Sequence, residues 1–166
     1  MKLLLFSDNH RDKESLEKMI QKHPNIERII SLGDSEMKEH ELTNLNVFGV
    51  RGNYPTDPRF PKELTLVFEG VKFFLTHGHH YSVKLGLRRL LNHAIYNNID
   101  IACFGHTHRP LLRETKGVIL LNPGSLSSYR SGTQNSYAIV DITNKQIEVI
   151  ITTLNGEILS KYTKKR

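Results

Sequence analysis

A chain of 166 residues can bury the core of one domain, and its 23 basic and 17 acidic residues give a formal net charge of +6. It has no tryptophan and no basic run interleaved with aromatic residues, so nucleic acid is not expected as a partner. The single cysteine, Cys103, excludes an internal disulfide, and no apolar stretch has the length of a transmembrane helix or a signal sequence, so we expect a cytoplasmic protein that does not bind membranes.

Strand-like apolar runs alternate with helical patterns in the first two thirds of the chain. Five short runs are rich in β-formers and predict buried strands; they are residues 2–6, 28–32, 46–50, 71–75 and 99–104. Two amphipathic helices are predicted where apolar residues recur at helical spacing. The first is capped by Asp12 and ends at residues 23–25, and the second lies between Ser82 and Asn98.

Hairpins dominate the remaining predicted elements. Residues 64–68 and 71–75 flank Glu69-Gly70, a pair suited to a two-residue turn. Further strands are predicted at residues 118–121, 137–142, 147–154 and 158–162. Four basic residues occupy the last six positions, so we predict a solvated, frayed basic tail over 161–166. This order of elements indicates a single α/β domain over residues 1–166, a layered sandwich of mixed sheets rather than one parallel sheet.

The five strand-like runs share a feature at their C-terminal ends. Each is followed by carboxylate, imidazole or amide side chains, seven in all: Asp8, His10, Asp34, Asn53, His77, His106 and His108. Ligands of open α/β folds bind beyond the carboxyl ends of the strands, so we expect these side chains to converge. Two carboxylates, one amide and four imidazoles exceed what one metal ion needs. They suit two ions that share a bridging ligand.

Five motifs carry a family resemblance: Asp8-x-His10, Gly33-Asp34, Gly52-Asn53, His77-Gly78-His79 and Gly105-His106-x-His108. In this order they resemble the motif set of the calcineurin-like metallophosphoesterase superfamily. The short chain, the Asn122-Pro123-Gly124-Ser125 segment and the strand at Ser136-Tyr137-Ala138 resemble its small prokaryotic phosphodiesterase branch. The resemblance implies a four-layer α-β-β-α sandwich of two mixed sheets.

The resemblance also implies a role for each of the seven side chains. Asp8, His10 and His108 would hold one divalent ion, and Asn53, His77 and His106 a second, with Asp34 bridging the two. Asp34, Asn53 and His77 would form the catalytic centre, where a hydroxide held between the ions attacks a phosphodiester of a small or nucleotide-type substrate. Manganese is the first choice of metal, and mixed nitrogen and oxygen ligation also suits nickel, zinc, iron or cobalt. Two ions, two carboxylates and one hydroxide leave a charge of about +1, which favours an anionic substrate.

Substrate contacts are expected from five residues: Asn53, Tyr54, His79, Arg11 and Arg109. The two arginines, like Arg51, each follow a motif and can either bind phosphate or be ordinary surface residues. Tyr54 occupies a position where relatives carry histidine or cysteine. A phenol with a pKa of about 10 is a weaker proton donor than imidazole, so we expect good leaving groups to be favoured. Tyr54 can instead stack on a base or serve packing alone.

Three rival functions remain to be compared. A non-catalytic scaffold subunit of the retromer type resembles this fold with some ligands replaced, whereas all seven positions here carry ligand-capable side chains. A nuclease is disfavoured because the chain has no added domain and no aromatic-basic groove. A phosphomonoesterase stays open because the same metals would serve it. Self-association as a homo-oligomer is compatible with the resemblance, since family members commonly self-associate.

Overall fold

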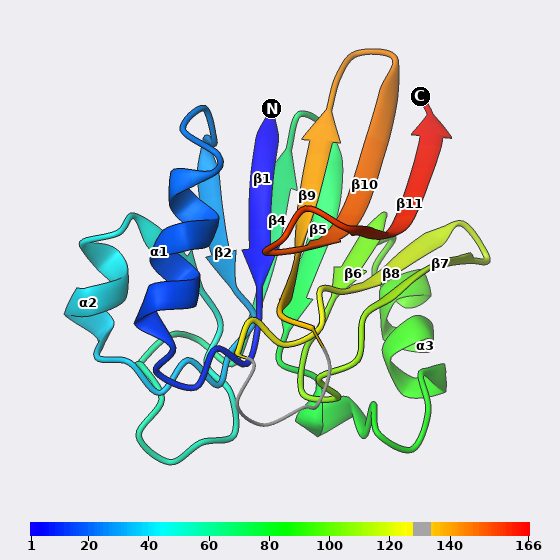
Figure 1. Ribbon diagram of the computed structural model, residues 1–166. Helices are drawn as coiled ribbons and strands as arrows, with labels where there is room; N and C mark the ends of the chain where they lie inside the picture. Colours follow the sequence, from blue (N-terminus) through cyan, green and yellow to red (C-terminus); the bar gives the residue numbers. More distant parts are fainter. Residues whose placement is uncertain (128–133) are drawn as a thin grey trace.

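The computed structural model describes residues 1–127 and 134–166, and it contains two packed β-sheets (Figure 1). Sheet A has six strands in the order β11-β10-β9-β1-β2-β3. Their bounds are β1 Lys2–Phe6, β2 Arg28–Ser31, β3 Val47–Gly49, β9 Ser136–Ile142, β10 Gln146–Thr153 and β11 Ile158–Lys165. Strands β1, β2 and β3 are parallel to one another, whereas β9 is antiparallel to β1, β10 to β9 and β11 to β10.

Sheet B has five strands in the order β4-β5-β6-β8-β7. Their bounds are β4 Glu63–Phe68, β5 Val71–Thr76, β6 Ile101–Cys103, β7 Leu111–Thr115 and β8 Val118–Asn122. The three central strands β5, β6 and β8 are parallel, and the edge strands β4 and β7 are antiparallel to their neighbours. Both sheets are therefore mixed, as predicted.

Helices cover the outer faces of the two sheets (Figure 1). On sheet A lie α1 (Lys13–Gln21) and α2 (Glu39–Thr43), and on sheet B lie the 3₁₀ helix η1 (His79–Tyr81) and α3 (Arg88–Tyr96). The predicted four-layer α-β-β-α sandwich is confirmed. Within the described ranges, the structure contains no helix long and apolar enough to span a membrane.

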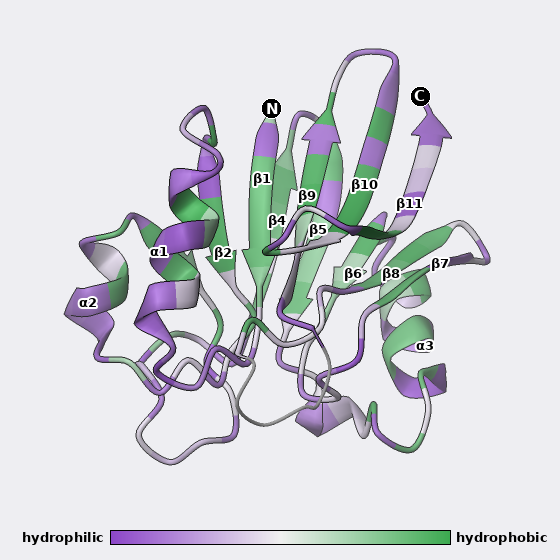
Figure 2. Cartoon of the chain, in the orientation of Figure 1, coloured by the Kyte–Doolittle hydropathy of each residue, from purple (hydrophilic) through white to green (hydrophobic). Residues whose placement is uncertain are grey.

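The apolar run of β1 serves two cores at once, which explains its continuous hydrophobicity (Figure 2). Leu3 and Leu5 point into the core between the sheets, and Leu4 and Phe6 point toward α1 and α2. Successive side chains of a strand alternate between its two faces, so a strand buried on both faces needs an apolar residue at every position. Burial on both faces places β1 in the interior of sheet A.

Local signals predicted some boundaries and missed others. The Asp12 cap of α1 is confirmed, because its Oδ1 accepts the Ser15 N–H at 3.0 Å. The helix predicted between Ser82 and Asn98 is present as Arg88–Tyr96, and it does not reach back to Ser82, which has a left-handed φ of 54°. Elements β7, α2 and η1 were not predicted. Strand β7 was not predicted because it lies at a sheet edge and exposes charged side chains, which interrupt its apolar pattern.

The frayed basic tail predicted for 161–166 is wrong. The chain there is the second half of β11, which pairs with β10 up to Lys165. Two of its charges are engaged in this way: Lys161 pairs with Glu148 at 2.8 Å, and the Arg166 guanidinium donates to the Glu69 carbonyl at 2.6 Å. Tyr162 Oη also donates to a Glu114 carboxylate oxygen at 2.5 Å. Because Glu69 and Glu114 belong to the turn and edge strand of sheet B, β11 ties the two sheets together.

Candidate metal centre

The loops that follow β1, β2, β3, β5 and β6 meet at one end of the two sheets (Figure 1). Five of the predicted ligands there have left-handed backbones, with positive φ at Asp8, His10, Asp34, His106 and His108. Residues other than glycine rarely adopt this conformation, and it costs of order 1–3 kcal/mol each. Such strain is concentrated at functional sites in proteins, and here five candidate ligands in neighbouring loops share it, whereas the other positive-φ residues include single positions in turns such as Glu69 and Lys116.

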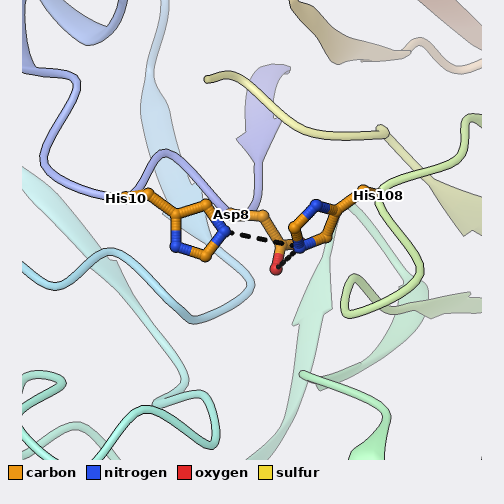
Figure 3. Close-up of side chains that lie close together, drawn as sticks. All are labelled: Asp8, His10 and His108. Atoms are coloured by element: carbon orange, nitrogen blue, oxygen red, sulfur yellow. Dashed lines mark hydrogen bonds and ion pairs between the residues drawn. The ribbon is translucent and has the colours of Figure 1, made fainter. Parts of the chain in front are cut away.

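A first cluster is formed by Asp8, His10 and His108, whose ligand atoms all lie within 4.8 Å of one another (Figure 3). His108 Nε2 is 3.1 Å from Asp8 Oδ1 and 3.4 Å from His10 Nε2. Asp8 is completely buried, and its Oδ2 accepts the His106 N–H at 3.0 Å. Its Oδ1 accepts no hydrogen bond from any described residue. A buried carboxylate oxygen without a donor points to a cation as its partner.

A second cluster is formed by Asp34, His77 and His106, again with all ligand atoms within 4.8 Å. His77 Nε2 lies 3.4 Å from Asp34 Oδ2 and 3.1 Å from Asn53 Oδ1. The two clusters adjoin, because the same His77 nitrogen is 3.9 Å from Asp8 Oδ1. All seven predicted ligands therefore lie in one continuous group.

Hydrogen bonding on the outer side of two rings leaves their inner nitrogens available as ligands. His77 Nδ1 donates to the Leu32 carbonyl at 2.8 Å, and His10 Nδ1 lies 2.7 Å from Glu36 Oε1. Burial opposes a positive charge on His77, but hydrogen bonding to Asp34 and the charges of Asp8 and Asp34 outweigh it and raise the His77 pKa. In the neutral form, which is the one that binds metal, each Nε2 instead carries a lone pair directed at the cluster. The residues present thus fit two metal ions.

The charges of the site support the same assignment. Burial opposes ionisation of Asp34, but hydrogen bonding to His77, the charge of His77 and the Tyr54 N–H outweigh it and hold the Asp34 pKa well below its usual value. Burial, followed by the charge of His77, lowers the pKa of His106 to about 4. Asp34 is therefore anionic and His106 neutral at neutral pH, the forms that bind metal.

Two buried carboxylates that the sequence did not reveal support these loops. Asp57 accepts the backbone N–H groups of Asp34, Glu36 and Gly52, so it holds the loop after β2 against the loop after β3. Glu36, fixed in this way, contacts His10 Nδ1. Neither carboxylate lies in a recognisable motif, and no signal in the sequence relates them to the site.

A third support is the segment that ends β8 and follows it, Asn122-Pro123-Gly124-Ser125. Asn122 Nδ2 donates to the Gly105 carbonyl and to Thr107 Oγ1, each at 3.0 Å. Ser125 Oγ donates to the Asp8 carbonyl at 2.8 Å. These bonds brace the loops that carry Asp8, His106 and His108.

Close packing of the ligand loops explains two glycines of the motifs. A Cβ on Gly52 would collide with the Asp34 carboxylate, and a Cβ on Gly105 would lie 2.8 Å from Asp8 Oδ2 and collide with the Ser7 side chain. The glycines are required because neighbouring loops approach their backbones, so that ligands from different strands can reach one another.

Three of the five predicted substrate contacts, Asn53, Tyr54 and His79, lie close to the ligand clusters. The exposed Asn53 and the half-buried Tyr54 lie at the centre, where the Tyr54 N–H donates to Asp34 Oδ1 at 2.9 Å. The centroid of the His79 ring lies 5.5 Å from that of the His77 ring and 6.0 Å from that of the His106 ring. Burial, followed by the charges of His80 and His77, lowers the His79 pKa to about 4.

The three arginines contact other parts of the molecule. Arg11 Nε donates to the Glu36 carbonyl at 2.9 Å, which makes it a brace for the loop after β2. Arg109 lines a pocket beside the centre, and Arg51 lines a different one together with Lys38.

Comparison with known proteins identifies the family. Residues 1–145 match the calcineurin-like phosphoesterase superfamily domain. The chain belongs to this superfamily. It is 31% identical over 145 residues to the probable metallophosphoesterase YsnB of Bacillus subtilis, with 87% of this chain and 86% of the relative covered. Phosphodiesterase MJ0936 of Methanocaldococcus jannaschii is 29% identical over 171 residues, covering 91% and 99%.

A solved structure, Vacuolar Protein Sorting 29 from Cryptosporidium parvum, matches with a TM-score of 0.80 and 19% identity, covering 99% of this chain and 97% of that one. Similarity at this identity shows the fold alone. The predicted membership of the superfamily, with small prokaryotic phosphoesterases as relatives, is confirmed.

Replacing Glu36 by alanine is expected to lower the affinity of one of the two metal sites and leave the other unchanged. Because Glu36 orients His10, its loss should reduce affinity at the Asp8–His10–His108 cluster by about 10- to 100-fold, while the other cluster keeps its affinity. Calorimetric titration of Mn²⁺ into chelator-treated protein measures both sites. The exposed Glu39 in α2, changed to alanine, is the control. Unchanged binding, or equal weakening of both sites, would contradict this role.

Proposed function

We propose that this protein is a phosphodiesterase that binds two divalent ions, manganese first among them, and hydrolyses a small or nucleotide-type substrate. The observation that supports it is the adjacency of two ligand clusters, with Asp8 Oδ1 3.9 Å from His77 Nε2. When bound, two ions held by these adjoining clusters would supply electrophilic stabilisation of the phosphoryl oxygens and a water nucleophile of lowered pKa. The name of the relative MJ0936, a phosphodiesterase, agrees with the proposal.

The side chains of the centre divide the work between them. Asp8, His10 and His108 would hold the first ion, and Asn53, His77 and His106 the second. Asp34 would contribute to both, since a carboxylate has two oxygens to share: Oδ2 lies 3.4 Å from His77 Nε2, and Oδ1 accepts the Tyr54 N–H. The Asn53 side chain is exposed to solvent, so its amide N–H can also donate a hydrogen bond to a phosphate oxygen.

The residues available to protonate the leaving group are weak proton donors. Tyr54 follows Asn53 in the loop after β3, and its phenol donates a proton less readily than an imidazolium would. His79, with its pKa lowered to about 4, is neutral at pH 7. Esters with acidic leaving groups should therefore react fastest, since they need little proton donation.

Turnover of matched nitrophenyl esters tests the function. The chelator-treated protein is loaded separately with Mn²⁺, Ni²⁺ and Zn²⁺ and assayed on bis-p-nitrophenyl phosphate and p-nitrophenyl phosphate. We expect metal-dependent hydrolysis with a higher kcat/KM for the diester. A higher value for the monoester would identify a phosphomonoesterase. Metal binding without turnover of either ester would favour a scaffold of the Vps29 type, against which the seven complete ligand positions argue.

A further inference from the structure

A pocket of about 560 Å³ lies beside the metal centre, between the loop that precedes α3 and the loop after β6. Its volume falls in the range of small-molecule sites. Val83, Leu87, Phe104 and Leu111 give it an apolar lining, and Lys84 and Arg109 add two positive charges. The pocket therefore combines a surface for a ring or hydrocarbon body with groups that attract an anion.

The pocket shares its walls with the metal centre. Phe104 and Arg109 bracket the segment that carries His106 and His108, and Thr107 lies between those two ligands and also lines the pocket. On the other wall, Val83 packs so closely on Gly78, the neighbour of His77, that a Cβ there would lie 2.8 Å from Val83 Cγ2. A group bound at the metals is thus one short loop away from the pocket.

The two positive charges are free to bind a ligand. Lys84 and Arg109 are exposed, and neither side chain forms a hydrogen bond or ion pair with any residue in the described ranges.

We propose that this pocket binds one ester arm of the substrate, and that this arm carries a ring and a negative charge of its own, as in a nucleoside with an additional phosphate. The proposal rests on the phosphodiesterase function. The ring would lie against Leu87 and Phe104, and the additional anion would lie between Lys84 and Arg109. Selectivity for such arms would come from the pocket, while the metals would bind the phosphodiester that is cleaved.

Two diesters that differ only in that anion test the proposal. They are thymidine 5′-(p-nitrophenyl phosphate) and the same compound with a 3′-phosphate. We expect wild-type kcat/KM to be about tenfold higher for the 3′-phosphorylated diester, the effect of two exposed ion pairs. The double variant Lys84→Gln/Arg109→Gln should bring this ratio close to one. A control that removes two exposed charges outside the pocket, Arg88→Gln/Arg113→Gln, should keep it.

A binding measurement separates failure of the pocket from failure of the function. Thymidine 3′,5′-bisphosphate and thymidine 5′-monophosphate are titrated into chelator-treated wild-type protein and the double variant. Tighter binding of the bisphosphate to the wild type alone would support the pocket even if no ester is hydrolysed. A wild-type protein that turns over diesters but does not distinguish the two compounds, or a double variant that keeps the preference, would overturn the proposal.

Discussion

Replacing Asp34 by asparagine is expected to lower kcat/KM for a diester on the order of 10³-fold, about 4 kcal/mol of transition-state stabilisation. The amide side chain of the variant can still accept the Tyr54 N–H through its remaining oxygen, so the loop should keep its shape. The atom that faces His77 becomes an amide nitrogen, which cannot bind a metal ion. The variant should therefore remain folded while both ions bind more weakly.

Metal stoichiometry and steady-state kinetics measure this effect together. Asp141→Asn serves as the control, because Asp141 lies on β9, away from the ligand loops, and its carboxylate forms a surface ion pair with Lys2 at 3.6 Å. Near-full turnover by the Asp34 variant, with two ions retained at wild-type affinity, would refute the bridging role.

Replacing Asp57 by alanine should lower the stability of the fold more than removing a carboxylate that accepts one hydrogen bond. The change leaves three buried backbone N–H groups without an acceptor, those of Asp34, Glu36 and Gly52. Each unsatisfied buried donor costs about 1–3 kcal/mol, so the free energy of unfolding should fall by about 3 kcal/mol or more. For a chain of this size, the melting temperature should fall by roughly 6 °C or more.

Thermal denaturation of the chelator-treated protein isolates this effect from metal binding. Asp100→Ala is a matched control, because the Asp100 carboxylate accepts a single backbone N–H, that of Lys72 at 2.8 Å. Its loss should be about 1 kcal/mol. If the Asp57 variant melts no lower than the Asp100 variant, the three hydrogen bonds do not hold the ligand loops together.

Local patterns in the sequence determined the elements that carry the ligands. The run at β1 reads as a buried strand because both of its faces are covered, and the Asp12 cap marks the start of α1. The convergence of the seven candidate ligands could be expected because each follows a strand, and the parallel strands of both sheets that carry them terminate at the same end of the sandwich. The superfamily followed from the order of those motifs.

Only the tertiary structure decided what supports and surrounds the centre. Glu36 is 26 residues from His10 and Ser125 is 117 residues from Asp8, so the sequence carries no local pattern that pairs them. The basic end of the chain gave the same difficulty: its charges indicated a free tail, but the structure pairs them with Glu148 on the neighbouring strand and with the Glu69 carbonyl on the other sheet. Periodicity and capping depend on neighbours a few residues apart, whereas these contacts exist only after the two sheets pack and bring distant loops together.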